Sequence, residues 1–457
     1  MANWERVSTN LTNLYFFDSV GIGNKIYAPG SVLKSDPDLN SYKRRLAIFD
    51  ASNNQVSQGP DMINPGSDII TVALGDSVYA IGGTNQQEEN QNNFYLRYTR
   101  EFKTSDNQWY SRSLYPNGYS TTFAAVCSFQ DRIYAFGGLG IVDQKEHNRV
   151  IVYNSQGDIW AFVAGVNLPL NQWRSASATS YGNSIYIAGG AYRESDNSPL
   201  LYTNAFYKFD PIANKFERLA DAPFTHVYKS FAYGDSIYAV AATKWSGENG
   251  PVYRYDIANN YWVQIAPAHP GSKVEFSILG NYIYAATQNW SNQNLVWDRI
   301  DLRSATISNP QPTAGFVNDQ APVNFTWELV STPTTVQQKS AQFQWRQTGS
   351  STIHTINATG AQTSVTVPAY TLPNGSFQWR VKATDTLDIS TDWTDWYTLS
   401  TTDEPPLKPT GLYPNTGVRP GTSPIQFSWL HRSPLGTPQS AFELQVTYND
   451  GATWANL

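Results

Sequence analysis

The segment GDSVYAIGG, residues 75–83, decides the fold because near copies of it recur along the N-terminal part of the chain. Each copy joins a polar turn to an Ile-Tyr or Val-Tyr pair and then to small residues. The five further copies are GNKIYAPG (23–30), QDRIYAFGG (130–138), GNSIYIAGG (182–190), GDSIYAVAA (234–242) and GNYIYAATQ (280–288). Alternating apolar strands at this regular period indicate six repeated units, each a small antiparallel β-sheet.

A second feature follows five of the six copies at a constant spacing. A large apolar residue is followed seven positions later by another bulky residue, in the pairs Phe49 and Val56, Phe102 and Trp109, Tyr153 and Trp160, Phe209 and Phe216, and Tyr255 and Trp262. The spacing predicts a hairpin between the third and fourth strands of each sheet. The sixth copy has no such partner downstream, but NWERV at 3–7 resembles KFERL at 215–219. We therefore expect residues 1–8 to complete the last sheet and close the ring.

The pattern changes after about Ser304. Short alternating strands are predicted at 325–329, 341–346, 364–368, 377–385 and 393–401, which fits one β-sandwich over residues 304–404. A stiff PPLKP segment at 405–409 precedes a second start of the same pattern, FSWL at 427–430. Residues 405–457 are thus expected to be the beginning of a second sandwich, incomplete at Leu457 and lacking about 45–50 residues by domain size.

Composition narrows the class of protein. Aromatic residues make up 14% and charged residues only 15%, with 31 Gly and 26 Pro, so an all-β chain rich in turns is predicted. The net charge of −6 without a basic cluster argues against nucleic acid and anionic membranes as partners. A single cysteine, Cys127, and five scattered histidines predict no metal and no cofactor, and the absence of an 18-residue apolar run predicts no membrane insertion.

The repeats resemble the kelch-repeat β-propeller family over residues 1–303, with departures from the family's twin glycine at Pro29-Gly30, Ala241-Ala242 and Ala285-Ala286. This resemblance implies a six-bladed kelch-like propeller. The C-terminal segments resemble the immunoglobulin-like fibronectin type III domains that are strung along phage tail and bacterial surface proteins. The fold class expected is therefore all-β, with a propeller followed by one whole sandwich and part of a second.

Candidate ligand-binding residues lie in the long loops expected on one face of the propeller. They are Tyr115, Tyr119, Trp173, Arg174, Tyr192, His226, Tyr228, Trp245 and Trp290. An aromatic ring beside amides and arginine suits a sugar, whose C–H face stacks on the ring while its hydroxyls bond to the polar groups. The alternative for each ring is that it only plugs the loop side of the core. As a set, loops on a rigid scaffold favour recognition.

No catalytic residues are predicted. One loop contains the cluster Asp143, Glu146 and His147, which could be interpreted as acid–base groups or metal ligands. A solvated loop face is the simpler interpretation. A copper oxidase on a kelch propeller would need Cys127 bonded to a tyrosine and two histidine ligands. Cys127 sits in the apolar segment TTFAAVCSF, where it is expected to pack as a small apolar residue.

These features lead to the expectation of a non-enzymatic recognition protein. The first hypothesis is a phage tail or tail-fibre component of the virion that attaches to the host, with a host-surface glycan or protein receptor as its ligand. Other virion proteins, or further copies of the chain, would be its assembly partners. The alternatives are a secreted bacterial adhesin or lectin at the cell surface, and a kelch-propeller enzyme acting on sialic acid.

Overall fold

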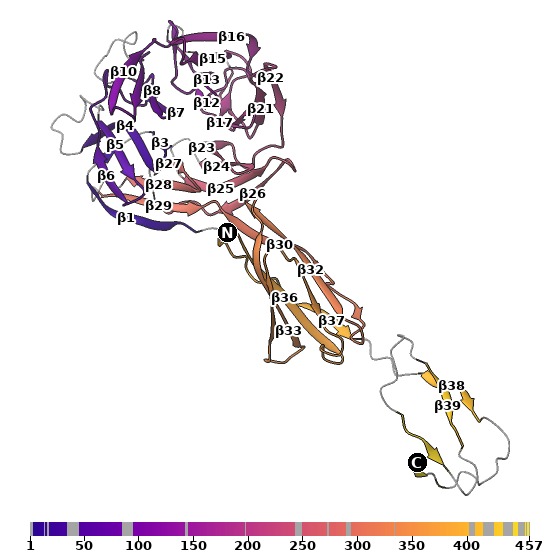
Figure 1. Ribbon diagram of the computed structural model, residues 1–457. Coiled ribbons are helices and arrows are strands. Elements are labelled where there is room, and N and C mark those ends of the chain that lie inside the picture. The colour runs from indigo at the N-terminus through magenta and orange to yellow at the C-terminus, as the bar shows by residue number, and fades with distance from the viewer. Residues whose placement is uncertain are drawn as a thin grey trace. The chain divides into compact units, whose positions relative to one another are not determined.

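The computed structural model describes residues 3–12, 14–15, 18–33, 45–84, 95–141, 145–196, 198–242, 249–271, 274–288, 294–332, 334–401, 407–414, 425–432, 442–446, 453 and 455–456. The chain divides into two compact units, Met1–Arg303 and Ser304–Leu457. Every regular element among the described residues is a β-strand (Figure 1). Within this described part, no helix has the length and apolar character needed to span a bilayer.

Six antiparallel sheets make up most of the first unit. We number them one to six and give the strands of each from the inner to the outer one. Sheet one contains β3 (Val20–Ile22), β4 (Lys25–Leu33), β5 (Arg45–Asp50) and β6 (Gln55–Gln58), and sheet two contains β7 (Ile70–Leu74), β8 (Ser77–Ile81), β9 (Thr99–Lys103) and β10 (Gln108–Arg112). Sheet three contains β12 (Ala125–Phe129), β13 (Arg132–Phe136), β15 (Arg149–Asn154) and β16 (Ile159–Asn167), and sheet four contains β17 (Ser177–Tyr181), β18 (Ser184–Ala188), β21 (Phe206–Asp210) and β22 (Lys215–Arg218). Sheet five contains β23 (His226–Tyr233), β24 (Ser236–Ala242), β25 (Asn249–Asp256) and β26 (Tyr261–Ala266), and sheet six contains β27 (Val274–Leu279), β28 (Tyr282–Gln288), β29 (Asn294–Asp301) and β1 (Glu5–Thr12).

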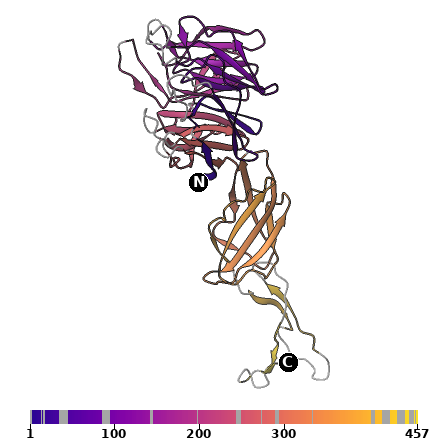
Figure 2. The ribbon, with the colours of Figure 1, turned by 90° about the vertical axis from the view of Figure 1, so that its left-hand side faces the viewer.

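The six sheets surround a common axis. Their inner strands contact one another in the closed series β3, β7, β12, β17, β23, β27 and back to β3, and Figures 1 and 2 show the ring from two directions. The fourth strand of sheet six comes from the other end of the unit, because Glu5 and Arg6 of β1 lie opposite Arg299 and Asp298 of β29. The first and last strands of the ring therefore share one sheet.

The constant spacing of seven residues has a direct structural cause. In each of the five sheets concerned, the two bulky residues are cross-strand partners on the third and fourth strands, as in Tyr153 opposite Trp160. The hairpin between them contains one left-handed residue two positions before the second bulky residue: Asn54, Asn107, Asp158, Asn214 or Asn260, with φ between 47° and 58°. Asn and Asp tolerate this conformation better than other residues with a side chain.

The twin glycines end the second strand where another backbone passes close by. A Cβ on Gly137 would lie 2.4 Å from the carbonyl oxygen of Trp173, and one on Gly190 would lie 2.5 Å from that of Arg174. In sheet five, where Ala241-Ala242 replaces the glycines, β24 instead continues to Ala242, which pairs with His226. The departures from the repeat thus correspond to longer second strands.

The second unit begins with two sheets that enclose one aromatic core. One sheet holds β30 (Ser304–Gln311), β32 (Val323–Thr332) and β35 (Ser364–Val367), and the other holds β31 (Phe316–Val317), β37 (Tyr397–Thr401), β36 (Ser376–Asp385), β33 (Gln338–Gln347) and β34 (His354–Thr359). Trp327, Phe343 and Trp379 are buried between them. Both indoles are satisfied: Trp327 Nε1 donates to Gln338 Oε1 at 2.8 Å, and Trp379 Nε1 donates to the carbonyl of Pro312 at 2.8 Å.

The remaining described residues form two short strand pairs. β38 (Leu407–Tyr413) pairs with β39 (Ser428–Arg432), and β40 (Gln445–Val446) pairs with β41 (Ala455–Asn456). Their large apolar side chains are between 40% and 69% exposed, at Leu412, Tyr413, Ile425, Phe427, Leu430 and Phe442. This segment therefore differs from residues 304–401, where a cluster of large aromatic residues lies in a closed core.

Candidate functional site

A cavity of about 390 Å³ lies on the axis of the ring, and we call it the axial pocket. One repeat position contributes to it from every sheet, because the residue nine positions before each repeat tyrosine lies within three residues of the first residue of an inner strand. These six residues are Asp18, Ile70, Ala125, Ser177, Lys229 and Glu275. The chain enters the inner strands from the segments that link successive sheets. The pocket therefore lies at the end of the axis that carries these linking segments, which we call the loop-bearing end.

Sheets five, six and one supply the charged side of the axial pocket. Lys229 Nζ donates to Asp18 Oδ1 at 2.5 Å and to the carbonyl oxygen of Ser19 at 2.6 Å. The second carboxylate oxygen of Asp18 accepts a hydrogen bond of 2.6 Å from the backbone N–H of Thr71. Asp18 therefore connects the inner strands of sheets two and five to its own, and the charge of Lys229 is paired.

Glu275 belongs to the same side of the axial pocket but has a different electrostatic environment. Burial raises its pKa well above the ordinary value, the negative charge of Asp18 raises it further, and Lys229 opposes both effects. The folded protein therefore favours the protonated form of this carboxyl. A protonated carboxyl can donate one hydrogen bond and still accept others.

Sheets two, three and four supply small and apolar side chains to the axial pocket, including Ile70 and Ala125. Tyr228 adds an aromatic side chain, which packs 5.7 Å from the buried ring of Phe276, and burial together with the charge of Glu275 raises the pKa of Tyr228 to about 12. Thr71 also lines the pocket; it is only 5% exposed, and its hydroxyl oxygen has no hydrogen-bond partner. The pocket is thus amphipathic and holds a buried polar atom that is unsatisfied.

Hydroxyl groups form the part of the axial pocket between sheets four and five. The Oγ atoms of Ser177 and Ser230 lie 2.9 Å apart, and the backbone N–H of Ser230 donates to Ser177 Oγ at 2.8 Å. Both serines line the cavity. A ligand in the pocket would therefore meet hydroxyls on one side and apolar surface on the other.

Two of the nine candidate residues predicted from sequence are buried rather than exposed. Tyr115 is fully buried with its ring edge-on to Trp160 at 4.8 Å, and Trp173 is 2% exposed with Nε1 donating to the carbonyl of Gly189 at 2.8 Å. The prediction of exposed rings was wrong at these two positions, because each indole or phenol fills the space beside a neighbouring sheet. A change at Trp173 would test folding and not ligand binding.

The other candidates are divided among several places. Tyr228 lines the axial pocket. Tyr119 is half-buried between the rings of His147 and Phe162, and Tyr192 packs on the core of sheets three and four. His226 lies on the ring of Tyr202, with the ring centroids 4.2 Å apart. Trp245 and Trp290 lie outside the described residues.

Arg174 contacts charged and aromatic neighbours within the protein. Its guanidinium forms an ion pair with Glu146 and lies 3.7 Å from the ring centroid of Phe123, while Arg193 approaches the same carboxylate at 3.9 Å. Glu146 is 8% exposed, so the expectation of a solvated loop face was wrong at this residue. Here the carboxylate joins loops of sheets three and four. Asp143 of the same predicted cluster lies outside the described residues.

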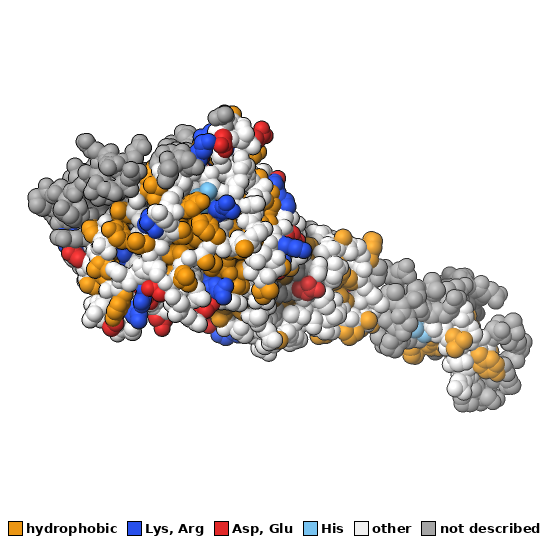
Figure 3. All heavy atoms as spheres, turned by 90° about the horizontal axis from the view of Figure 1, so that it is seen from above, with side chains coloured by type: hydrophobic (Ala, Val, Ile, Leu, Met, Phe, Trp, Pro, Cys, Tyr) orange, Lys and Arg blue, Asp and Glu red, His pale blue; other side chains and the backbone are white. Residues whose placement is uncertain are grey.

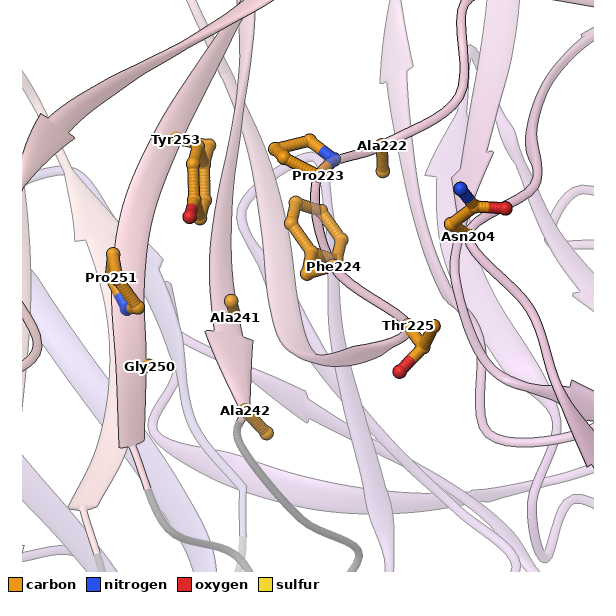
Figure 4. A pocket seen from close by; sticks show the side chains of 10 residues that line it. All are labelled: Asn204, Ala222, Pro223, Phe224, Thr225, Ala241, Ala242, Gly250, Pro251 and Tyr253. Atoms are coloured by element: carbon orange, nitrogen blue, oxygen red, sulfur yellow. The ribbon is translucent and has the colours of Figure 1, made fainter.

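A second cavity of about 450 Å³ lies between sheets four and five (Figure 4). Phe224 and Tyr253 form its aromatic part, with ring centroids 5.5 Å apart, and Asn204 and Thr225 supply polar groups at its other edge. Thr225 Oγ1 lies 2.9 Å from His226 Nδ1. Thr225, just before β23, thus contributes to this cavity, and Tyr228, within β23, contributes to the axial pocket.

The described residues include no group of three or more His, Cys, Asp and Glu side chains placed to hold a metal ion. Cys127 is buried, and burial raises the pKa of its thiol. His269 donates from Nε2 to Asp298 at 2.9 Å while its Nδ1 accepts from the backbone N–H of Gly271, so it is engaged inside sheet six.

The charged residues of the axial pocket were missed by the sequence reasoning. Asp18 and Glu275 lie at opposite ends of the ring-forming sequence, and no local motif joins them. The available signal was the repeat itself: aligning the six copies on their tyrosines places Asp18, Lys229 and Glu275 at one repeat position. Charged residues at a position that otherwise holds Ile, Ala and Ser mark a part of the axis that differs from an apolar core.

Comparison with known proteins agrees with the repeat analysis. Residues 69–285 match the KLHDC2/KLHL20/DRC7 kelch-repeats domain. The chain is similar to Kelch-like protein 25 of Xenopus tropicalis, with 22% identity over 54% of this chain and 40% of that protein. It is also similar to Kelch-like protein 36 of Mus musculus, with 25% identity over 29% and 21% of the two chains.

Two further matches extend the comparison. Kelch repeat protein M-T8 of Myxoma virus (strain Lausanne) is 24% identical over 38% of this chain and 31% of that protein. A solved structure titled "Structure of YjhT" superposes with a TM-score of 0.48 and 10% identity, covering 65% of this chain and 95% of the other. The matched regions span less than half the length of these three curated relatives. Together with the repeats, the family match shows that the first unit contains a kelch-repeat domain with a propeller-like fold.

Proposed function

We propose that this chain is a non-enzymatic recognition protein, a phage tail or tail-fibre component whose six-bladed kelch propeller binds a carbohydrate or protein receptor on the host surface. The six described sheets are its blades, and residues 304–404 and 405–457 are fibronectin type III-like spacers. The observation that carries the proposal is the axial pocket, an amphipathic cavity at the loop-bearing end of the ring. Kelch-repeat proteins usually mediate protein interactions.

The surface of the first unit is compatible with recognition of an uncharged or mixed surface. Figure 3 shows basic, acidic and hydrophobic side chains interspersed on the face seen there. The small sheets of β11 (Tyr119–Ser120) with β14 (Leu139–Gly140), and β19 (Ala191–Tyr192) with β20 (Leu201–Tyr202), stiffen two loops on the loop-bearing side. Loops held on a rigid scaffold are frequent carriers of binding residues.

The test is a glycan-array scan and a cell-retention assay over a panel of bacteria with the full chain. Tyr228→Ala and Lys229→Met should each weaken binding about tenfold or more, because both residues line the axial pocket. The matched control is Lys208→Met, whose ammonium forms an exposed ion pair with Glu217 on outer strands. Absence of binding to every glycan and cell surface, or equal binding by all three variants, would overturn the proposal.

A second candidate function is an enzyme that acts on a sugar in the axial pocket, such as a kelch-propeller enzyme acting on sialic acid. It is favoured by one observation, the placement of the Glu275 carboxyl and the Lys229 ammonium in one cavity, since proton transfer needs such groups near a substrate. Interconversion of sialic acid anomers, followed by NMR, should stay at the background rate under the recognition hypothesis. A rate above background that is lost in Glu275→Gln would favour the enzyme.

A further inference from the structure

We propose that the axial pocket binds an uncharged, polyhydroxylated group, such as a neutral hexose at the end of a glycan, and discriminates against acidic sugars. This inference rests on the proposed function for its biological setting but not for its chemistry. The chemistry follows from three features of the pocket: its charge balance, its amphipathic lining and its unsatisfied hydroxyl. Each feature concerns residues that line the cavity.

The charge balance disfavours an acidic ligand. Lys229 is already paired with Asp18 at 2.5 Å. Asp68 also lines the pocket and accepts a hydrogen bond of 2.9 Å from Thr84 Oγ1. An acidic ligand would meet these two carboxylates while the nearby ammonium is occupied. An uncharged ligand avoids this repulsion.

The lining has the two-sided character of a pyranose ring. Ile70 and Ala125 from sheets two and three, with the partly buried Tyr228, offer apolar surface to C–H groups. The serine hydroxyls of sheets four and five and the carboxyl of Glu275, whose pKa is raised by burial, offer hydrogen-bonding groups to ligand hydroxyls. A volume of about 390 Å³ lies at the small end of ligand sites, which span about 300–1,000 Å³.

The unsatisfied hydroxyl points independently to a bound polar group. Thr71 is 5% exposed, and its Oγ1 has no hydrogen-bond partner, although its backbone N–H is bonded to Asp18. Buried polar groups are nearly always hydrogen-bonded. A ligand hydroxyl in the axial pocket would supply the missing partner.

The experiment titrates the full chain with D-glucose, D-galactose, D-mannose and N-acetyl-D-glucosamine by saturation-transfer NMR. Each hexose that binds is then compared with its uronic acid analogue. We expect at least one hexose to bind and its uronic acid to bind at least about tenfold more weakly. Binding of none of the four hexoses, or equal or tighter binding of an acidic analogue, would overturn the inference.

Variants assign the binding to the axial pocket. Thr71→Val removes the unpartnered hydroxyl at nearly constant volume, so hexose binding should fall about tenfold without loss of thermal stability. Thr104→Val is the matched control on the same sheet, since its hydroxyl donates to the carbonyl of Asp76 in the turn between β7 and β8. Glu275→Gln, which keeps a donor, should bind more tightly than Glu275→Leu. Unchanged hexose binding in Thr71→Val would place the sugar elsewhere.

The two proposals fail in different ways. If Lys229→Met abolishes cell or glycan-array binding while no hexose binds, the recognition function stands and the ligand class is wrong. If a hexose binds in the pocket while pocket variants keep full cell and array binding, the ligand class stands and the recognition function is wrong.

Discussion

The ring and residues 304–401 of the second unit place their charged side chains differently. In the ring, Asp18, Lys229 and Glu275 face a cavity on the axis. In the second unit, Arg346 and Arg380 lie over Trp396 at 4.2 and 4.3 Å, outside a core that is closed by aromatic residues. Two sheets packed face to face can fill the space between them with large side chains. Six inner strands around an axis leave a centre that their side chains do not fill, and polar groups there remain available to a ligand.

The same difference appears in how buried charge is satisfied. Arg100, in sheet two, is fully buried, and its guanidinium donates to the carbonyl oxygens of Ile63, Asn64 and Gly82. Burial lowers the pKa of this guanidinium to about 9. The ring thus uses cationic side chains to satisfy loop carbonyls inside the fold, whereas in the second unit Arg346 and Arg380 hold an aromatic segment on the outside of a sheet.

The largest expected effect is on ring closure. Deleting residues 1–8 removes the start of β1, the ring contact of Trp4 with His269 at 4.7 Å and the bond between Arg6 and Asp298. We expect the ring to lose about 5 kcal/mol and about 10 °C in Tm, because β29 becomes an edge strand and apolar surface is exposed. Scanning calorimetry measures this, with the transition of the second unit as internal control. An unchanged ring Tm would contradict it.

The next effect should be confined to the second unit. Trp379→Ala opens a cavity in the core between its two sheets and should cost about 3–5 kcal/mol there, with little change in the ring. Trp393→Ala, at an indole that is stacked on Arg380 and only partly buried, serves as the control and should cost much less. Urea unfolding measures the loss of stability in each variant. Equal losses would show that the buried core is not the main source of stability.

A smaller effect tests the paired charge at the axis. Lys229→Met leaves Asp18 without its ammonium partner in a partly buried site, and we expect a loss of about 2 kcal/mol. The control Lys208→Met breaks a more exposed pair with Glu217 and should change stability by no more than about 1 kcal/mol. The two variants are compared by urea unfolding at neutral pH; a result in which they are equally stable would remove the contrast between axis and surface.

The pH dependence of stability should come partly from Glu275. Its pKa is raised in the folded protein, so its contribution is fully present below the unfolded value of 4.5 and is lost as the pH rises toward the folded value. Glu275→Gln cannot ionise. The stability of this variant relative to the unaltered protein should therefore increase from pH 4.5 upward, as measured by urea unfolding across pH. A constant difference would mean that Glu275 is not desolvated.

The smallest effect concerns the outer stack of the second unit. Arg380→Met keeps the apolar stem but removes the cation that lies 4.5 Å from the ring centroid of Trp393. We expect a loss of about 1 kcal/mol, the usual contribution of such a contact near the surface. Trp fluorescence and thermal unfolding measure it. A loss as large as that of Trp379→Ala would show that the outer face contributes as much as the core.

Much of the fold could be predicted because its information is local. The repeat tyrosines and the seven-residue pairs report contacts within one sheet, and each such pair is a cross-strand pair of one hairpin. The kelch-repeat domain was identified on these residues. Single loop residues were harder, because burial of Tyr115 and Trp173 depends on how neighbouring sheets pack and not on the polar residues beside them in sequence.

The number and spacing of the repeats, the strand-forming segments and the Asn or Asp at each left-handed hairpin position follow from the sequence alone, because all of these depend on residues within one repeat. That Asp18, Thr71, Lys229 and Glu275 share a cavity follows from the folded structure. Ring closure brings the two ends of the first unit together, and burial raises the pKa of the Glu275 carboxyl. Such contacts join residues far apart in the chain, and the shared repeat position of Asp18, Lys229 and Glu275 does not by itself specify them.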